Sequence, residues 1–117
     1  MKVVDRKTFL ALPAGTVFSK YAPCVFDDLC IKGETLATDD FLVQQLVDAV
    51  ECTDCGDFSN KLRRSKVLGE SVRMDFDCLG RDGCFDADQL FAVWEKRDVL
   101  GLIGRLLSAV MEAPCHQ

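Results

Sequence analysis

Histidine is nearly absent from this sequence of 117 residues, and the one histidine, His116, is the penultimate residue. Ser-His and Cys-His catalytic pairs need an imidazole base held beside the nucleophile, a role for which a chain end is poorly suited. Glycine-rich phosphate loops of the Walker or dinucleotide type are also missing. These absences count against most nucleophilic and nucleotide-dependent enzymes, and we expect a protein that is not an enzyme and carries no cofactor.

Long hydrophobic runs are missing as well. No apolar stretch approaches the roughly 20 residues that a membrane-spanning helix needs. The first nine residues, MKVVDRKTF, carry charges where a secretion signal would be apolar. We therefore expect a cytoplasmic protein without membrane contact.

The sequence also has no excess of basic residues, with 14 Lys and Arg against 19 Asp and Glu. The net charge is −5 and the isoelectric point is near 4.7. Phosphate contact needs a basic face, so direct binding to nucleic acid is not expected.

Cysteine, in contrast, is plentiful and odd in number, with seven residues. In a reducing compartment these are expected to be free thiols. Cys24, Cys30 and Cys78 stand among apolar neighbours, so we expect them to be small buried hydrophobic residues.

The second half of the chain carries the strongest local patterns. Apolar residues alternate strictly over 71–78, which predicts a half-buried antiparallel strand. A tight turn is expected at 80–83, and the apolar run 90–94 predicts a second strand of the same hairpin, although its length does not exclude a helix. Apolar residues then recur every three or four positions over 98–112, which predicts a helix with Asp98 as its N-cap and Pro114 as its stop.

The first half is expected to supply a small sheet and shorter helices. The patterns predict a helix at 5–12 that Asp5 caps and that turns Phe9 inward. They also predict a strand at 16–21 and an interrupted strand at 24–31, with a turn or bulge at Asp27 and Asp28. The segment 40–51 fits either a helix or a strand and is assigned to a helix, and a short helix is expected at 57–66 with Phe58 and Leu62 buried.

These elements predict a single α+β domain over residues 1–117. We expect an antiparallel β-sheet with two or three helices packed on one face, including a C-terminal helix at 98–112. Both a monomer and a homodimer fit this pattern.

The most specific motif is Cys52-Thr53-Asp54-Cys55-Gly56, which resembles half of a zinc knuckle. A structural zinc site needs four ligands, and no second C-x-x-C follows. The remaining candidates, Cys78, Cys84, Cys115 and His116, stand at no standard spacing. A small zinc-stabilised structural protein that uses Cys52 and Cys55 is therefore one alternative.

Carboxylates form two clusters. Residues 39–57 hold six Asp or Glu and no Lys or Arg, and residues 75–88 hold five with one Arg. The second cluster fails as a calcium loop because Leu79 occupies the fifth position. It could instead bind a partner protein that has a basic surface. The expected partner-binding residues are Asp75, Asp77, Asp82, Asp86 and Asp88. A small hydrolase that uses paired carboxylates is a second alternative.

Three short segments of the sequence resemble parts of other proteins. They are FLALPAGTV at 9–17, IKGET at 31–35 and DQLFAVWE at 88–95. They resemble segments of small uncharacterised proteins encoded by bacteriophages and prophages. The resemblance implies a location in the host cell cytoplasm and an accessory role. It also implies an inhibitor of a host protein, such as a nucleic-acid-binding defence protein.

Overall fold

The computed structural model describes residues 1–37 and 39–112. The strands are β1 (Lys2–Val4), β2 (Val17–Ala22), β3 (Val25–Phe26), β4 (Cys30–Leu36), β5 (Asp40–Gln45), β6 (Leu79–Arg81) and β7 (Leu90–Val93). The helices are α1 (Arg6–Leu10), α2 (Cys55–Leu68) and α3 (Lys96–Glu112). The predicted α+β class, with a C-terminal helix, is confirmed.

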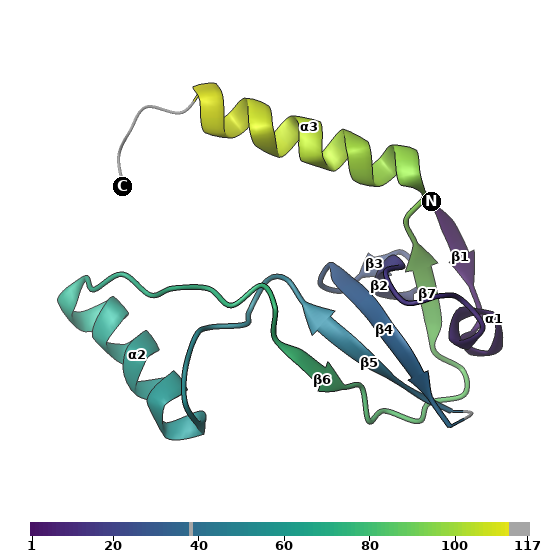
Figure 1. The fold of residues 1–117 in the computed structure, drawn as a ribbon, viewed down its shortest axis with the longest axis horizontal. Coiled ribbons are helices and arrows are strands. Elements are labelled where there is room, and N and C mark those ends of the chain that lie inside the picture. The colour runs from purple at the N-terminus through teal and green to yellow at the C-terminus, as the bar shows by residue number, and fades with distance from the viewer. Residues whose placement is uncertain (38, 113–117) are drawn as a thin grey trace.

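All strand pairs are antiparallel, and the sheet runs in the order β1-β7-β2-β4-β5-β6, with β3 attached to β2. The last strand in the sequence, β7, lies between β1 and β2 (Figure 1). The sheet is therefore held together by contacts between the two ends of the chain.

Four phenylalanines form the centre of the core. Phe9 from α1 stacks on Phe91 of β7, with ring centroids 3.9 Å apart, and meets Phe18 and Phe41 edge-on. All four are at most 1% exposed. Aromatic pairs in these geometries add to the stability gained from buried area alone. The short helix α1 thus covers the part of the sheet made by β1, β7 and β2.

Both ends of α1 are satisfied by side chains. Asp5 is the N-cap, as predicted, and its carboxylate accepts the Thr8 N–H at 2.8 Å. At the other end, Thr35 Oγ1 donates to the Leu10 carbonyl at 2.6 Å, and the buried Lys32 ammonium donates to Thr35 Oγ1 at 2.8 Å. A cation at this end also suits the helix dipole.

The strand β5 replaces the helix assigned to 40–51, and that assignment is wrong. The β-branched residue Val43 and its neighbours pair with β4 on one side and β6 on the other. Tertiary pairing outweighs the helical spacing of the polar residues in this segment.

The expected hairpin between 71–78 and 90–94 is also wrong. In 71–78 only Met74 pairs, in an isolated bridge with Val50. The strand β6 begins at Leu79 and pairs with β5, whereas β7 is a strand, as predicted, but pairs with β1 and β2. The expected turn over 80–83 is only partly present, with Gly83 at a positive φ of 65°.

The helix α2 lies on an excursion from the sheet (Figure 1). Two backbone hydrogen bonds join the start and the end of this excursion. The Glu51 N–H donates to the Arg73 carbonyl at 2.9 Å, and the Asp75 N–H donates to the Ala49 carbonyl at 2.8 Å. Asp54 caps the start of the helix and Gly69, with φ of 72°, ends it. None of its residues is fully buried. Of the pair expected to be buried, Phe58 is half-buried and Leu62 is exposed.

The helix α3 starts two residues before the predicted position. Asp98 is therefore inside the first turn, where its carboxylate accepts the backbone N–H of Glu95 at 3.0 Å, and it is not the N-cap. Pro114, the predicted stop, lies outside the described residues. Within 1–37 and 39–112, no helix is long and apolar enough to cross a bilayer.

The packing of α2 and α3 on one face of the sheet is not observed. Like α2, α3 has no buried residue, and it extends away from the sheet (Figure 1). Of the three described helices, only α1 contributes to the core.

Candidate functional site

The candidate site is a groove on the same face of the sheet as α1, beside the part that α1 covers. Phe18 of β2 pairs with Cys30 of β4, which pairs with Gln45 of β5, so the three side chains share this face. Val43 lies on the same face, two residues before Gln45. These residues form the floor of the groove.

Two adjoining hollows make up the groove. One has a volume of about 290 Å³ and the other about 360 Å³, and both are lined by Val43 and Gln45. The second extends to Phe58 of α2 and Arg81 of β6. The groove is therefore long enough to take several side chains of an extended segment.

Carboxylates surround the groove. Asp27 and Asp28 line the first hollow and Asp48 lines the second. All three are exposed, and none forms an ion pair with another described residue. We call these three aspartates, with the two hollows, the acidic groove.

The Cys30 thiol on the floor of the groove has a raised pKa. Burial of the thiol, together with the nearby charges of Asp28, Asp48 and Asp27, raises the pKa of Cys30 to about 11, against a smaller opposing effect of Lys20. The Cys30 thiol is therefore an unreactive packing group, as expected for this residue. Cys24 and Cys78, which were expected to be buried, are exposed.

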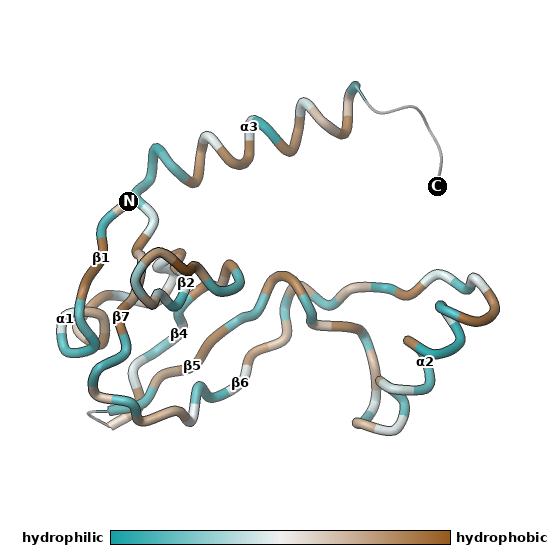
Figure 2. The backbone as a smooth tube through the Cα atoms, turned by 180° about the vertical axis from the view of Figure 1, so that it is seen from behind, coloured by the Kyte–Doolittle hydropathy of each residue, from teal (hydrophilic) through white to brown (hydrophobic). Residues whose placement is uncertain are grey.

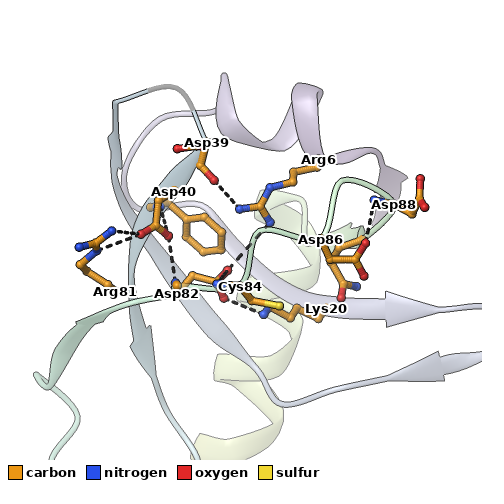
Figure 3. A network of polar contacts seen from close by, with 12 residues as sticks. Arg6, Lys20, Asp39, Asp40, Arg81, Asp82, Cys84, Asp86 and Asp88 are labelled. Carbon is orange, nitrogen blue, oxygen red and sulfur yellow. Dashed lines mark hydrogen bonds and ion pairs between the residues drawn. The ribbon is translucent and has the colours of Figure 1, made fainter.

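Asp82 also lines the first hollow, but its charge is compensated. Its side chain is 6% exposed, with Oδ1 2.6 Å from Lys20 Nζ and Oδ2 3.9 Å from Arg6 Nη1. Arg6 Nη2 donates to the Asp39 carbonyl at 2.6 Å (Figure 3). These contacts tie the segment after β6 to α1 and β2.

Asp40 anchors the same segment from the other side (Figure 3). Its carboxylate accepts the N–H groups of Gly83 at 3.0 Å and Phe41 at 2.9 Å, and it pairs with Arg81 at 2.8 Å. The Gly83 N–H is the largest of the effects that lower the pKa of Asp40, and the Phe41 N–H and Arg81 add to it against the opposing effect of burial. Asp40 is thus a structural anion.

The other predicted partner-binding aspartates lie apart from the groove lining. Asp75 accepts the N–H of Asp77 at 2.9 Å, and Asp86 accepts the N–H of Asp88 at 2.9 Å. Each pair shapes its own turn. The strand β6 separates the two pairs along the chain, and Asp82, the fifth member, is buried.

Cys52 and Cys55 lie exposed at the start of α2. Among the described residues, no group of three or more His, Cys, Asp or Glu side chains is placed to hold a metal ion. Cys78 and Cys84 therefore do not complete a zinc site with them. Cys115 and His116 lie outside the described part of the chain.

The sequence patterns missed Asp27 and Asp28 as site residues. The sequence predicts a turn or bulge at these two residues, and they lie in the short connection between β3 and β4. The helix predicted over 40–51 also gave no reason to expect Asp48 beside Asp27 and Asp28. Only the order of strands in the sheet brings the three aspartates to one groove.

Comparison with known proteins adds no identification. No family model, curated protein or solved structure matches this chain.

Proposed function

We propose that this protein is a non-enzymatic interaction module that binds a lysine- or arginine-rich segment of a partner protein in the acidic groove. The observation that carries the proposal is the set of three exposed carboxylates around the two hollows, none of which forms an ion pair with another described residue. Each hollow is lined by one cation, Lys20 or Arg81, and these cations are already paired with Asp82 and Asp40.

The chemistry of the groove suits long basic side chains. Lys and Arg can lay their aliphatic stems along apolar surface while their charged ends reach a polar rim. Val43 and Phe58 supply such a surface, and Asp27, Asp28 and Asp48 supply the rim. Binding through exposed charges of this kind speeds association and weakens as salt screens the charges.

The class of partner follows from the resemblance to bacteriophage proteins. That resemblance implies a host protein whose basic surface normally contacts nucleic acid. Carboxylates around a groove would occupy such a surface in place of phosphate groups. A pull-down from bacterial lysate would search for this partner, and the test of the groove itself needs a defined probe.

The probe is a labelled peptide of alternating lysine and leucine, with a glutamate–leucine peptide as its control. Two matched double variants carry equal changes in charge: Asp27→Asn with Asp28→Asn in the groove, and Asp86→Asn with Asp88→Asn in the loop before β7. Fluorescence anisotropy measures the affinity of each at low salt and at about 0.5 M salt.

We expect the basic peptide to bind the wild-type chain and the glutamate peptide not to bind. The groove variant should lose at least about tenfold in affinity, while the loop variant stays within about twofold, because exposed charges act over about 10 Å. Loss of affinity in the loop variant alone would show that the peptide binds at Asp86 and Asp88, and it would overturn the acidic groove as the binding site. Binding that is insensitive to salt and to both variants would overturn acidic docking altogether.

A further inference from the structure

The first hollow of the acidic groove suits a positive charge. Asp27, Asp28 and Asp82 line it, and Lys20, the cation that also lines it, is paired with Asp82. Asp27 and Asp28 are exposed, and neither forms an ion pair with another described residue. The first hollow therefore keeps two negative charges that no cation of the described chain compensates.

The second hollow is different, because apolar side chains line much of it. They are Val43, Ala49, Phe58 and Cys78. A free cysteine packs as a small hydrophobic residue. Phe58 is half-buried and comes from α2, so this helix supplies one wall of the second hollow. Burial of a large apolar side chain against such a surface is favourable.

The Arg81 side chain is directed away from the second hollow. In the pairing of β5 with β6, Arg81 lies opposite Leu42, whereas Gly80 lies opposite Val43. Successive side chains of a strand point to opposite faces of the sheet, so Arg81 and Val43 are on different faces. The Arg81 guanidinium is paired with Asp40. Arg81 therefore does not make the second hollow a site for a charged group.

Asp48 lines the second hollow, but its charge also acts on the first. Burial is the largest cause of the raised pKa of Cys30, which lines the first hollow. The charges of Asp28, Asp48 and Asp27 add to this effect, against the opposing charge of Lys20. The negative field of all three aspartates therefore reaches the first hollow.

The two hollows adjoin, because Val43 and Gln45 line both. The strand that carries these residues, β5, is apolar in its middle and polar at its end (Figure 2). In an extended segment, side chains two positions apart point to the same side and lie about 7 Å apart. Side chains with this spacing are the nearest pair that can enter adjoining hollows together.

We infer that the partner segment is extended and carries a Lys or Arg two positions away from a large apolar residue such as Leu. The basic side chain enters the first hollow, beside Asp27 and Asp28, and the apolar side chain enters the second, against Phe58. Gln45, which lines both hollows, is exposed, and its amide can donate to and accept from the backbone of the segment. This inference rests on the proposed function, because it specifies the segment that the acidic groove binds.

Two labelled peptides of identical composition test the spacing. One consists of Lys-Ser-Leu-Ser repeats, which place Lys and Leu on the same side of an extended chain. The other consists of Lys-Leu-Ser-Ser repeats, which place them on opposite sides. Fluorescence anisotropy measures the affinity of each for the full chain. We expect the same-side peptide to bind at least about tenfold more tightly, because only its Lys and Leu can enter the two hollows together.

Matched variants assign each side chain to its hollow. Phe58→Ala removes a wall of the second hollow, whereas Leu62→Ala removes an exposed side chain of the same helix that lines neither hollow. Phe58→Ala should reduce the preference for the same-side peptide to less than about threefold, and Leu62→Ala should leave it unchanged. Asp27→Asn with Asp28→Asn should weaken both peptides alike. Circular dichroism confirms that the variants keep their helical content.

Three results would overturn the inference, and they differ in what they leave standing. Equal affinity of the two peptides, with binding still weakened by salt, would overturn the spacing and leave the proposed function intact. A preference that survives Phe58→Ala would place the apolar side chain outside the second hollow. Absence of binding by both peptides would overturn the proposed function together with the inference.

Discussion

Lys20 Nζ lies 2.6 Å from Asp82 Oδ1, which joins β2 to the segment that follows β6. In the sequence, Asp82 belongs to a run of aspartates with a common appearance. In the structure, its charge is compensated and its side chain is buried, while Asp86 and Asp88 of the same run are exposed. Contacts within the fold therefore decide which carboxylates are available to another molecule.

Asp82→Asn is expected to lower the free energy of unfolding by about 1–3 kcal/mol, because it leaves Lys20 and Arg6 without their anionic partner. Asp88→Asn, the control, removes the same charge from an exposed side chain and should stay within about 0.5 kcal/mol. Urea unfolding followed by circular dichroism measures both. Equal effects of the two substitutions would show that the Lys20–Asp82 contact contributes nothing specific.

Asp40→Asn should destabilise the protein most at neutral pH. Because contacts in the folded state lower the pKa of Asp40, its carboxylate contributes stability that is complete above the ordinary pKa and lost as pH falls through the lowered one. The difference in urea midpoint between wild type and variant should therefore shrink below about pH 4. A difference that is constant with pH would contradict the assignment of Asp40 as a structural anion.

Gly33→Ala should destabilise the sheet, because the new Cβ would lie 2.8 Å from Leu42 Cβ and 3.2 Å from the Leu42 carbonyl oxygen. We expect a loss of about 1–3 kcal/mol in the free energy of unfolding. Gly104→Ala is the matched control, since its Cβ would meet nothing within 4 Å. It should stabilise α3 by up to about 1 kcal/mol, and a lowered melting temperature in this variant would contradict that expectation.

Cys30 should resist alkylation in the folded protein. With its pKa raised to about 11, roughly one thiol in a thousand is ionised at pH 8, and the side chain is also buried. Iodoacetamide at that pH should label the exposed Cys24 and Cys52 first, and peptide mass spectrometry would follow each site. In urea Cys30 should be labelled with the others, and equal labelling rates in the folded state would contradict the burial of its thiol.

Local signals predicted several elements well. Asp5 before α1 and the apolar periodicity of α3 depend on residues a few positions apart, and both helices form where these signals stand. Phe9 was expected to face inward and is the centre of the core. Such signals work because a helix satisfies its backbone hydrogen bonds within its own segment.

Strand pairing was predicted less well, for a physical reason. A strand satisfies its backbone groups through another strand, so the choice of partner depends on distant parts of the chain. The segment 71–78 alternates as strictly as a strand should, yet only Met74 forms a bridge, while β6 and β7 find partners in β5, β1 and β2.

By itself, the sequence determined the α+β class, the helix α1 with its cap and the amphipathic character of α3, because propensity, capping and periodicity are local properties. Only the tertiary structure decided which aspartates are compensated and which surround a groove. Charge compensation needs atoms within about 4 Å, and Lys20 reaches Asp82 only because β2 and the segment after β6 meet in space. Tertiary structure also decided that the apolar side of α3 does not pack on its own sheet, since the short helix α1 already supplies the core.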